Sequence, residues 1–222
     1  MARKRSNRKS RERKSAGVTS KRAAGRAAGP AVKRTSRRTS KGASKRPARV
    51  PERPAFVVHW TKIEQADDSH YEGDDELMSI GTPFGQHFGL TRLGIHHQRV
   101  LPGRRTSYPH AESAEEEFVY VIAGTPDVWL DGELHRLRPG DAVGFAAGTG
   151  ICHSFLNNTA GEVRLLVVGE TSKAENRAFY PRNPEQATRT DWWSDPPARP
   201  MGDHDGLTDR VRARRARAGK AR

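Results

Sequence analysis

Short apolar runs, separated by glycine, proline and aspartate, dominate the middle of this 222-residue chain. Turn residues recur about every 8–12 positions, and no amphipathic helical repeat lies between the runs. Short strands at this spacing are typical of an all-β sandwich or barrel. We therefore predict strands over residues 56–60, 94–101, 118–122, 128–130, 134–137, 141–145, 152–156 and 163–168.

One turn in this pattern has a specific geometry. The dipeptide Asp131-Gly132 lies between residues 128–130 and 134–137, two of the predicted strands. Asp-Gly is a strong signal for a two-residue hairpin with a type I′ turn, because both central residues of that turn need positive φ. Residues 64–90 and 171–209 carry acidic and proline-rich patches, and we predict that they wrap around the barrel without regular structure.

The positive charge of the chain is concentrated at its two ends. Residues 1–50 hold 19 Lys and Arg side chains and one acidic residue, whereas residues 51–209 hold 14 basic and 25 acidic ones. Basic tails of this kind bury too little apolar surface to offset the entropy of ordering. We predict a disordered Lys/Arg-rich tail over residues 1–53, a folded domain with flanking segments over residues 54–209, and a basic C-terminal tail over residues 210–222. We expect the C-terminal tail to be disordered too, although its composition also permits a helix.

The basic tails suggest an anionic partner. A flexible polycation binds phosphate groups by releasing counterions, so we expect weak nucleic-acid binding that is independent of base sequence and sensitive to salt. No helix-turn-helix or other base-reading element is visible. A solvated extension, or a translation start assigned too early, is the simpler explanation of the N-terminal tail, and we favour it.

The sequence also indicates where the protein functions. No stretch approaches the roughly 20 apolar residues that a membrane-spanning helix needs. The N-terminal region is rich in Arg and Ser, but it has too few large apolar side chains for the amphipathic face of an organellar leader. The single cysteine, Cys152, excludes an intrachain disulfide, and we expect it to be a small core residue. We therefore predict a cytoplasmic protein without a membrane span.

Four polar side chains fall where strands should converge. His110 and Glu112 are two residues apart and share a face on a strand. Glu117 begins the next apolar strand on the face of Val119, so it should be a buried carboxylate, which is costly unless it is paired. His153 lies in a third segment. Two imidazoles and two carboxylates form a plausible site for a divalent Mn, Fe, Ni or Zn ion.

These residues resemble the two sequence motifs of the cupin superfamily over about residues 90–170. The first motif is matched by His110, Glu117 and Gly124, with Glu112 in the place of the usual second histidine, and the second by Gly140, Gly148, His153 and Asn157. Ala146 replaces the usual proline of the second motif. The resemblance implies an all-β cupin domain, a double-stranded β-helix (jelly-roll barrel), flanked by disordered basic tails. It also implies a metal site formed by His110, Glu112, Glu117 and His153. The sequence is similar to a group of single-domain bacterial cupins for which the family supplies an architecture and no substrate.

Each of these residues has an alternative interpretation. One interpretation of His110 and His153 is that they are hydrogen-bonded structural histidines, although their joint placement at both motifs favours ligation. Glu112 has three interpretations: a hard oxygen ligand, a base beside the metal, or a surface replacement in a barrel that has lost its metal. In the pair His96-His97, adjacent strand residues face opposite ways, so only one of them can line a pocket.

Three functional hypotheses follow. The first is a metal-binding cupin acting on a small polar organic molecule of the sugar or organic acid type, as an isomerase, lyase or dioxygenase. The second is a non-catalytic cupin that binds a small molecule, since the fold does not determine the function. The third is a nucleic-acid-associated protein that acts through its basic tails.

Other segments suggest partners or a lid. Arg104, Arg105 and Tyr108 either bind an anionic substrate or have structural roles. Trp192-Trp193 should fold back onto the barrel or a second subunit, and a lid over the pocket is the alternative. The predicted strand in residues 55–63 is suited to covering a sheet edge in its own or a partner subunit, so we expect a homodimer.

Overall fold

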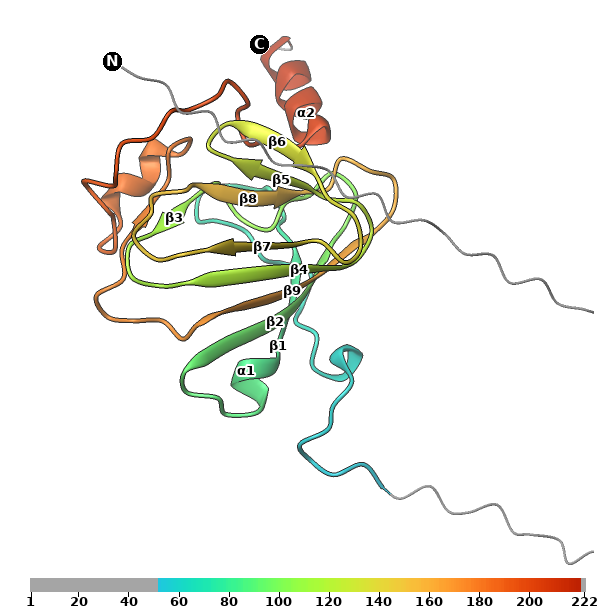
Figure 1. The fold of residues 1–222 in the computed structure, drawn as a ribbon. Coiled ribbons are helices and arrows are strands. Elements are labelled where there is room, and N and C mark those ends of the chain that lie inside the picture. Colours follow the sequence, from blue (N-terminus) through green and yellow to red (C-terminus); the bar gives the residue numbers. More distant parts are fainter. Residues whose placement is uncertain (1–51, 221–222) are drawn as a thin grey trace, which may run out of the picture. The chain divides into compact units, whose positions relative to one another are not determined.

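The structure, a computed structural model, describes residues 52–220 (Figure 1). The predicted disordered N-terminal tail, residues 1–53, lies outside the described residues except for Glu52 and Arg53, which are exposed and belong to no helix or strand. No helix among the described residues is both long enough and apolar enough to cross a membrane.

Three antiparallel sheets form the domain (Figure 1). The largest has the strand order β1-β2-β9-β4-β7, with bounds Ile80–Pro83, Leu93–Val100, Val163–Glu170, Glu117–Ala123 and Ala142–Phe145. The three-stranded sheet has the order β6-β5-β8, with bounds Glu133–Arg136, Asp127–Leu130 and His153–Leu156. A third sheet pairs β10 (Ala178–Phe179) with β3 (Ala111–Glu112). The predicted all-β jelly-roll architecture is confirmed.

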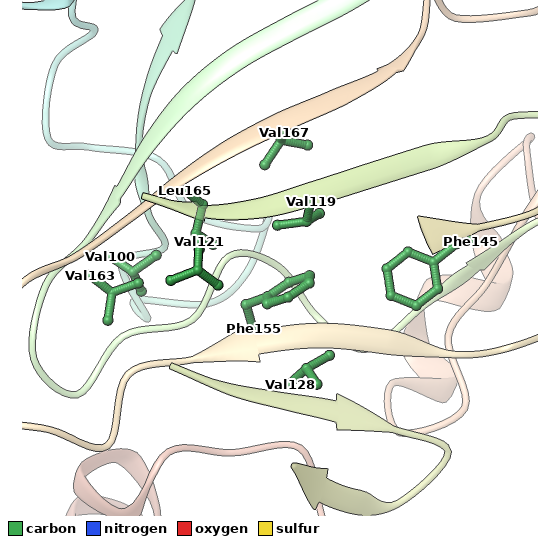
Figure 2. Packing of buried hydrophobic residues seen from close by; sticks show 9 residues of the cluster. All are labelled: Val100, Val119, Val121, Val128, Phe145, Phe155, Val163, Leu165 and Val167. Atoms are coloured by element: carbon green, nitrogen blue, oxygen red, sulfur yellow. The ribbon is translucent and has the colours of Figure 1, made fainter. Parts of the chain in front are cut away.

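The hydrophobic core lies between the five-stranded and the three-stranded sheets (Figure 2). Burial alternates along β9, where Val163, Leu165 and Val167 are buried and face the core. Phe155 and Val128 face them from the opposite sheet. This period of two is the pattern that the sequence predicts for strands with one face on a core.

The predicted hairpin joins β5 to β6. Asp131 and Gly132 have φ values of 45° and 94°, so both central residues of the turn have positive φ, as a type I′ turn requires. Gly132 is also needed for space, because a Cβ atom there would collide with the backbone of Gly202. The hairpin prediction is therefore confirmed.

Two predictions about the segment before β2 are wrong. Residues 56–60 form no strand: Phe56 and Val57 are exposed, and a short 3-10 helix, η1 (Trp60–Lys62), follows. Residues 64–90 are not wholly irregular, since they contain β1 and the short helix α1 (Phe84–His87). β1 has the sequence Ile-Gly-Thr-Pro and is an edge strand, the kind of strand in which proline is tolerated.

The expectation of a disordered C-terminal tail is also wrong. Residues Asp209–Lys220 form helix α2, which buries Val211 against the domain. Arg212 donates hydrogen bonds to Asp205 at 2.7 and 3.1 Å, and Arg215 lies 3.3 Å from Asp74. The basic tail is thus ordered by acidic groups of the folded domain, which a count of charge along the sequence cannot reveal.

The C-terminal segment before α2 returns to the barrel. It contains η2 (Pro184–Thr188), after which Trp192 packs against Phe179 and Tyr180, with ring centroids 5.6 and 6.5 Å apart. Trp193 packs against the cluster of Ala111, Trp129, Cys152 and Leu156. Cys152 is a buried core residue, and burial raises the pKa of its thiol to about 12. Both of these expectations, the fold-back and the core cysteine, are confirmed.

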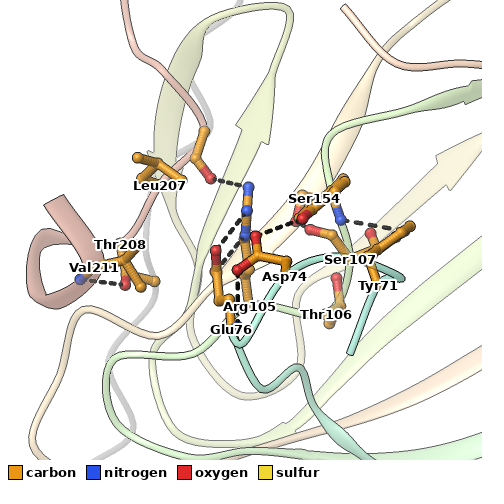
Figure 3. Close-up of polar contacts among 12 residues, drawn as sticks. Tyr71, Asp74, Glu76, Arg105, Thr106, Ser107, Ser154, Leu207, Thr208 and Val211 are labelled. Carbon is orange, nitrogen blue, oxygen red and sulfur yellow. Dashed lines mark hydrogen bonds and ion pairs between the residues drawn. The ribbon is translucent and has the colours of Figure 1, made fainter. Parts of the chain in front are cut away.

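A buried ion pair joins three parts of the chain (Figure 3). Arg105 donates to both carboxylate oxygens of Glu76, at 2.7 and 2.8 Å, and to the carbonyl oxygen of Gly206 at 2.9 Å. The two side chains are only 1% and 3% exposed. Arg104 pairs with Asp67, and the Tyr108 hydroxyl donates to Asp74 at 2.5 Å. The structural interpretation of Arg104, Arg105 and Tyr108 therefore holds in preference to substrate binding.

We predict that Glu76→Gln destabilises the domain severely, by about 3–5 kcal/mol, because it leaves the buried Arg105 guanidinium without its counter-charge. The double variant Glu76→Leu with Arg105→Met should recover most of this loss, since no charge is then left buried. As a control, Arg138→Gln breaks an exposed ion pair with Asp141 and should cost less than about 1 kcal/mol. Urea unfolding measures all three; equal losses for Glu76→Gln and Arg138→Gln would contradict this interpretation.

Candidate metal centre

Backbone pairing holds two of the predicted ligands side by side. His110, just before β3, and His153, the first residue of β8, each donate the backbone N–H to the carbonyl oxygen of the other, at 3.1 and 2.8 Å. Directly paired residues on antiparallel strands carry their side chains on the same face. The two imidazole rings accordingly lie 5.0 Å apart between centroids.

The third predicted ligand comes from the opposite sheet. Glu117, the first residue of β4, shares the inward face of its strand with Val119 and Val121, as the sequence predicts. Its Oε1 atom lies 3.5 Å from Nε2 of His153. The structure therefore brings His110, Glu117 and His153 together at one end of the space between the sheets.

The orientation of both imidazoles is set through their Nδ1 atoms. Nδ1 of His110 lies 2.8 Å from the carbonyl oxygen of Tyr108, and Nδ1 of His153 lies 3.3 Å from that of Ile151. A carbonyl oxygen only accepts, so Nδ1 carries the proton in each ring and Nε2 keeps its lone pair. Metal-binding histidines are commonly held in this way.

Aromatic neighbours fix the planes of the two rings. Phe145 stacks on His153 with centroids 3.5 Å apart and planes 9° apart, and Tyr180 stacks on His110 at 5.7 Å. Burial, reinforced by the neighbouring His153, lowers the pKa of His110 to about 4 against the opposing effect of Glu117. Burial alone would raise the pKa of Glu117, but the neighbouring imidazoles, that of His153 first, outweigh this and leave that pKa lowered. His110 is therefore neutral at pH 7, the form that binds a metal.

Glu112 lies beside this group and lines a different void. Together with Glu115, Glu117 and His153 it borders a space of about 10 Å³, which His110 does not line. Burial, together with the charges of Glu115 and Glu117, raises the pKa of Glu112 to about 7. The structure thus brings three of the four predicted ligands to one place and leaves Glu112 at its margin.

The residues present are suited to a divalent metal ion. Nε2 of His153 is buried and has no hydrogen-bond partner, a costly state for a polar atom, and an ion at this point would give that atom a partner. Two imidazole nitrogens and a carboxylate are a common donor set for Zn²⁺, Mn²⁺, Fe²⁺ and Ni²⁺. Across residues 52–220, however, no three His, Cys, Asp or Glu side chains already have the closed arrangement of a metal site. The donor set fits, and binding would require these side chains to move closer together.

The candidate site opens into a polar interior. A cavity of about 90 Å³ is lined by His110, Glu117 and His153 together with Gln98, Thr106, Ser107, Phe155 and Val167. Of the pair His96-His97, His96 is on the inward face of β2 with Gln98, and it lines a neighbouring larger cavity. His97 faces outward and stacks on Trp60, with centroids 4.7 Å apart. The prediction that only one of the two lines a pocket is confirmed, whereas Gln98 was missed, although its place two residues before the buried Val100 could have indicated it.

Comparisons with known proteins agree with this fold. Residues 96–169 match the family described as "Cupin domain". Protein SchB of Streptomyces halstedii is 35% identical over 94 residues, which cover 42% of this chain and 63% of SchB, so the chain spans less than two thirds of that relative. The match places a cupin domain at residues 96–169 of this chain.

The polyketide cyclase RemF from Streptomyces resistomycificus is 23% identical, with a TM-score of 0.47, over 61% of this chain and 94% of its own. A putative sugar phosphate isomerase from Acidithiobacillus ferrooxidans is 24% identical, with a TM-score of 0.51, over 58% of this chain and 83% of its own. The likeness to the Acidithiobacillus protein concerns the fold alone, so the function has to be argued from the site.

Proposed function

We propose that His110, Glu117 and His153 hold one divalent metal ion, namely Mn, Fe, Ni or Zn, and that the protein acts on a small polar organic molecule in the adjoining cavity. The observation that carries this proposal is the buried, unpartnered Nε2 atom of His153, 3.5 Å from the Glu117 carboxylate. A buried nitrogen with a free lone pair beside a carboxylate is a poor structural arrangement but a good pair of metal ligands.

A bound metal ion and the residues of the chain would have different roles in the reaction. A divalent ion bound there would act as a Lewis acid toward a carbonyl oxygen of the substrate. The backbone carbonyls of Tyr108 and Ile151 keep both Nε2 atoms available, and the side chains of Gln98 and Thr106 are placed to orient the substrate. Isomerase, lyase and dioxygenase chemistry are all compatible with such a site.

The two alternative functions make different demands. A non-catalytic binding barrel needs the cavity and no metal, so metal content separates it from the proposed function.

Nucleic-acid binding through the tails depends mainly on residues 1–51, which lie outside the described part of the chain. In α2, Arg214 and Arg215 already pair with Asp75 and Asp74, so the helix offers less charge than its sequence suggests. Weak nucleic-acid binding and a cytoplasmic location stay predictions.

We predict about one equivalent of divalent metal in protein loaded with Mn²⁺, Fe²⁺, Ni²⁺ or Zn²⁺ and then desalted, measured by elemental analysis. His153→Ala and His110→Ala should each weaken binding by at least about tenfold, because each removes a nitrogen ligand. His135→Ala, an exposed histidine on β6, is the matched control and should retain metal. Glu112→Gln should have a smaller effect than either ligand variant, because Glu112 lines a separate void.

Two results would contradict the metal proposal. Wild-type protein without stoichiometric metal under all four loadings is the first. The second is a folded His153→Ala variant that binds metal as tightly as the wild type. In either case the binding-barrel alternative takes its place.

The outer face of the five-stranded sheet supports the proposal that the protein is a homodimer. On β4, Phe118, Tyr120 and Ile122 alternate with the buried core residues and are 44%, 39% and 40% exposed. Leu93 of β2 is exposed on the same sheet. An exposed apolar row along β4 is unusual on a monomer, and a two-fold symmetric partner would cover it with the same row from a second copy.

We predict a dimer of the full chain in sedimentation velocity at micromolar concentration. Phe118→Lys should shift the protein to the monomer, since it places a charge in the centre of the apolar row. Leu134→Lys changes another exposed apolar residue, on β6 of the other sheet, and should leave the dimer intact. A monomeric wild type, or a Phe118→Lys variant that stays dimeric, contradicts this arrangement.

A further inference from the structure

A larger cavity lies beside the candidate metal centre. It has a volume of about 570 Å³ and shares Gln98 and Thr106 with the small cavity that His110 and His153 line. Its remaining lining residues come from the segment before β1, from β1 and from β2: Gln65, Ala66, Asp68, Ser69, Ser79, Gly81 and His96. A volume of this size accommodates a small organic molecule whose one end reaches the two histidines.

Among residues 52–220, the lining is polar and contains no cationic side chain. Amides, hydroxyls and an imidazole supply hydrogen-bond donors and acceptors, and the single charged group among these described residues is the carboxylate of Asp68. Sites that bind phosphate or carboxylate groups usually present Arg, Lys or a cluster of backbone N–H donors. An anionic group placed here would meet the negative charge of Asp68 instead of a positive one.

Three arginines of the neighbouring segments already form ion pairs outside the cavity. Arg104 pairs with Asp67 and also donates to the carbonyl oxygen of Met78 at 3.3 Å. Arg105 is enclosed with Glu76. Arg99 lies on the outward face of β2 between Glu64 and Glu162, at 3.0 and 2.6 Å. Among these three, no guanidinium can reach a ligand in the cavity without breaking an existing ion pair.

A hydrogen bond orients one amide in the lining, and a glycine leaves room for a second. The Ser79 hydroxyl donates to Oε1 of Gln98 at 3.1 Å, which leaves the amide N–H groups of Gln98 to donate to a ligand. Gly81 makes room for Gln65, because a Cβ atom at Gly81 would lie 2.8 Å from Oε1 of Gln65. The cavity therefore presents oriented amide and hydroxyl groups, which suit the hydroxyl groups of a ligand.

We propose that this cavity is the recognition site for the substrate and that the substrate is an uncharged molecule with several hydroxyl groups, bound by Gln98, His96 and Ser79. This inference rests on the proposed function, because the reacting end of the molecule is placed at His110 and His153. It adds a ligand specificity that does not follow from the fold. The site binds the neutral compound and excludes its phosphate ester or acid. The carboxylate of Asp68 repels an anion, and no cationic side chain among the described lining residues offsets that repulsion.

The test uses the full-length protein and three matched probes: D-glucose, D-glucose 6-phosphate and D-gluconate, with D-fructose and D-fructose 6-phosphate as a second set. Isothermal titration should show each neutral sugar binding at least about tenfold more tightly than its charged counterpart. Gln98→Ala should weaken the neutral sugars by about tenfold. Asp68→Lys, on the exposed part of the lining, should tighten the phosphate esters several-fold and change the neutral sugars little. Glu133→Lys, the same charge change on β6 of the other sheet, should leave all affinities unchanged.

Three results would overturn the inference: phosphate esters or gluconate binding as tightly as the neutral sugars, no probe binding at all, or Asp68→Lys and Glu133→Lys having equal effects. Its failure is distinguishable from failure of the metal proposal. If the protein holds stoichiometric metal and prefers phosphate esters, the metal proposal stands and the proposed specificity is wrong. If it binds neutral sugars without metal, the recognition site stands and the metal proposal is wrong.

Discussion

The buried ion pair between Arg105 and Glu76 is the contact on which the rest of the domain depends. It fixes the segment before β1, through Glu76, to the segment that runs alongside β8, and Arg105 also holds the carbonyl oxygen of Gly206 ahead of α2 (Figure 3). Burying two charges this deeply costs more free energy of desolvation than their attraction recovers, unless both groups are fully hydrogen-bonded. Here the contact is bidentate, and a carbonyl oxygen is a further acceptor. The same carboxylate also contacts α2, because Arg215 lies 3.5 Å from Glu76.

This contact reaches the candidate metal centre through the backbone. Arg105 is bridged to Leu156 of β8, and the Thr106 N–H donates to the carbonyl oxygen of Phe155 at 2.9 Å. That pairing continues to His110 and His153, so the register of the two imidazoles is set by the segment that Arg105 holds. Between them, Tyr108 lies under the Arg105 guanidinium at 4.7 Å, and its carbonyl oxygen accepts from Nδ1 of His110. The ion pair and the imidazole orientation therefore belong to one continuous network.

Much of the fold and part of the site could be predicted from the sequence, because strand periodicity and turn chemistry are local. The alternation of apolar and polar residues predicted that Glu117 faces inward, and the Asp131-Gly132 dipeptide predicted a type I′ turn. The partner of a side chain is not local, and what the sequence left open or got wrong is of that kind. For Arg105, anion binding and a structural role both stayed open, because Glu76, 29 residues earlier, gives no signal of contact. The Arg-rich end looked disordered because two of its acidic partners, Asp74 and Asp75, lie more than a hundred residues away. Glu112 stands in the place of a motif's usual second histidine, and it lines a different void from His110.

The most direct test of the central claim, that His110, Glu117 and His153 form a metal centre at the inner end of a polar cavity, is X-ray absorption spectroscopy of the full-length protein loaded with Zn²⁺. We expect a first shell of nitrogen and oxygen only, at about 2.0–2.2 Å. Outer-shell scattering should require two imidazole rings, and His153→Ala should reduce that to one. A first shell of oxygen atoms alone with no imidazole scattering, or a spectrum that is the same for wild type and His153→Ala, would show that the ion binds elsewhere and would contradict the claim.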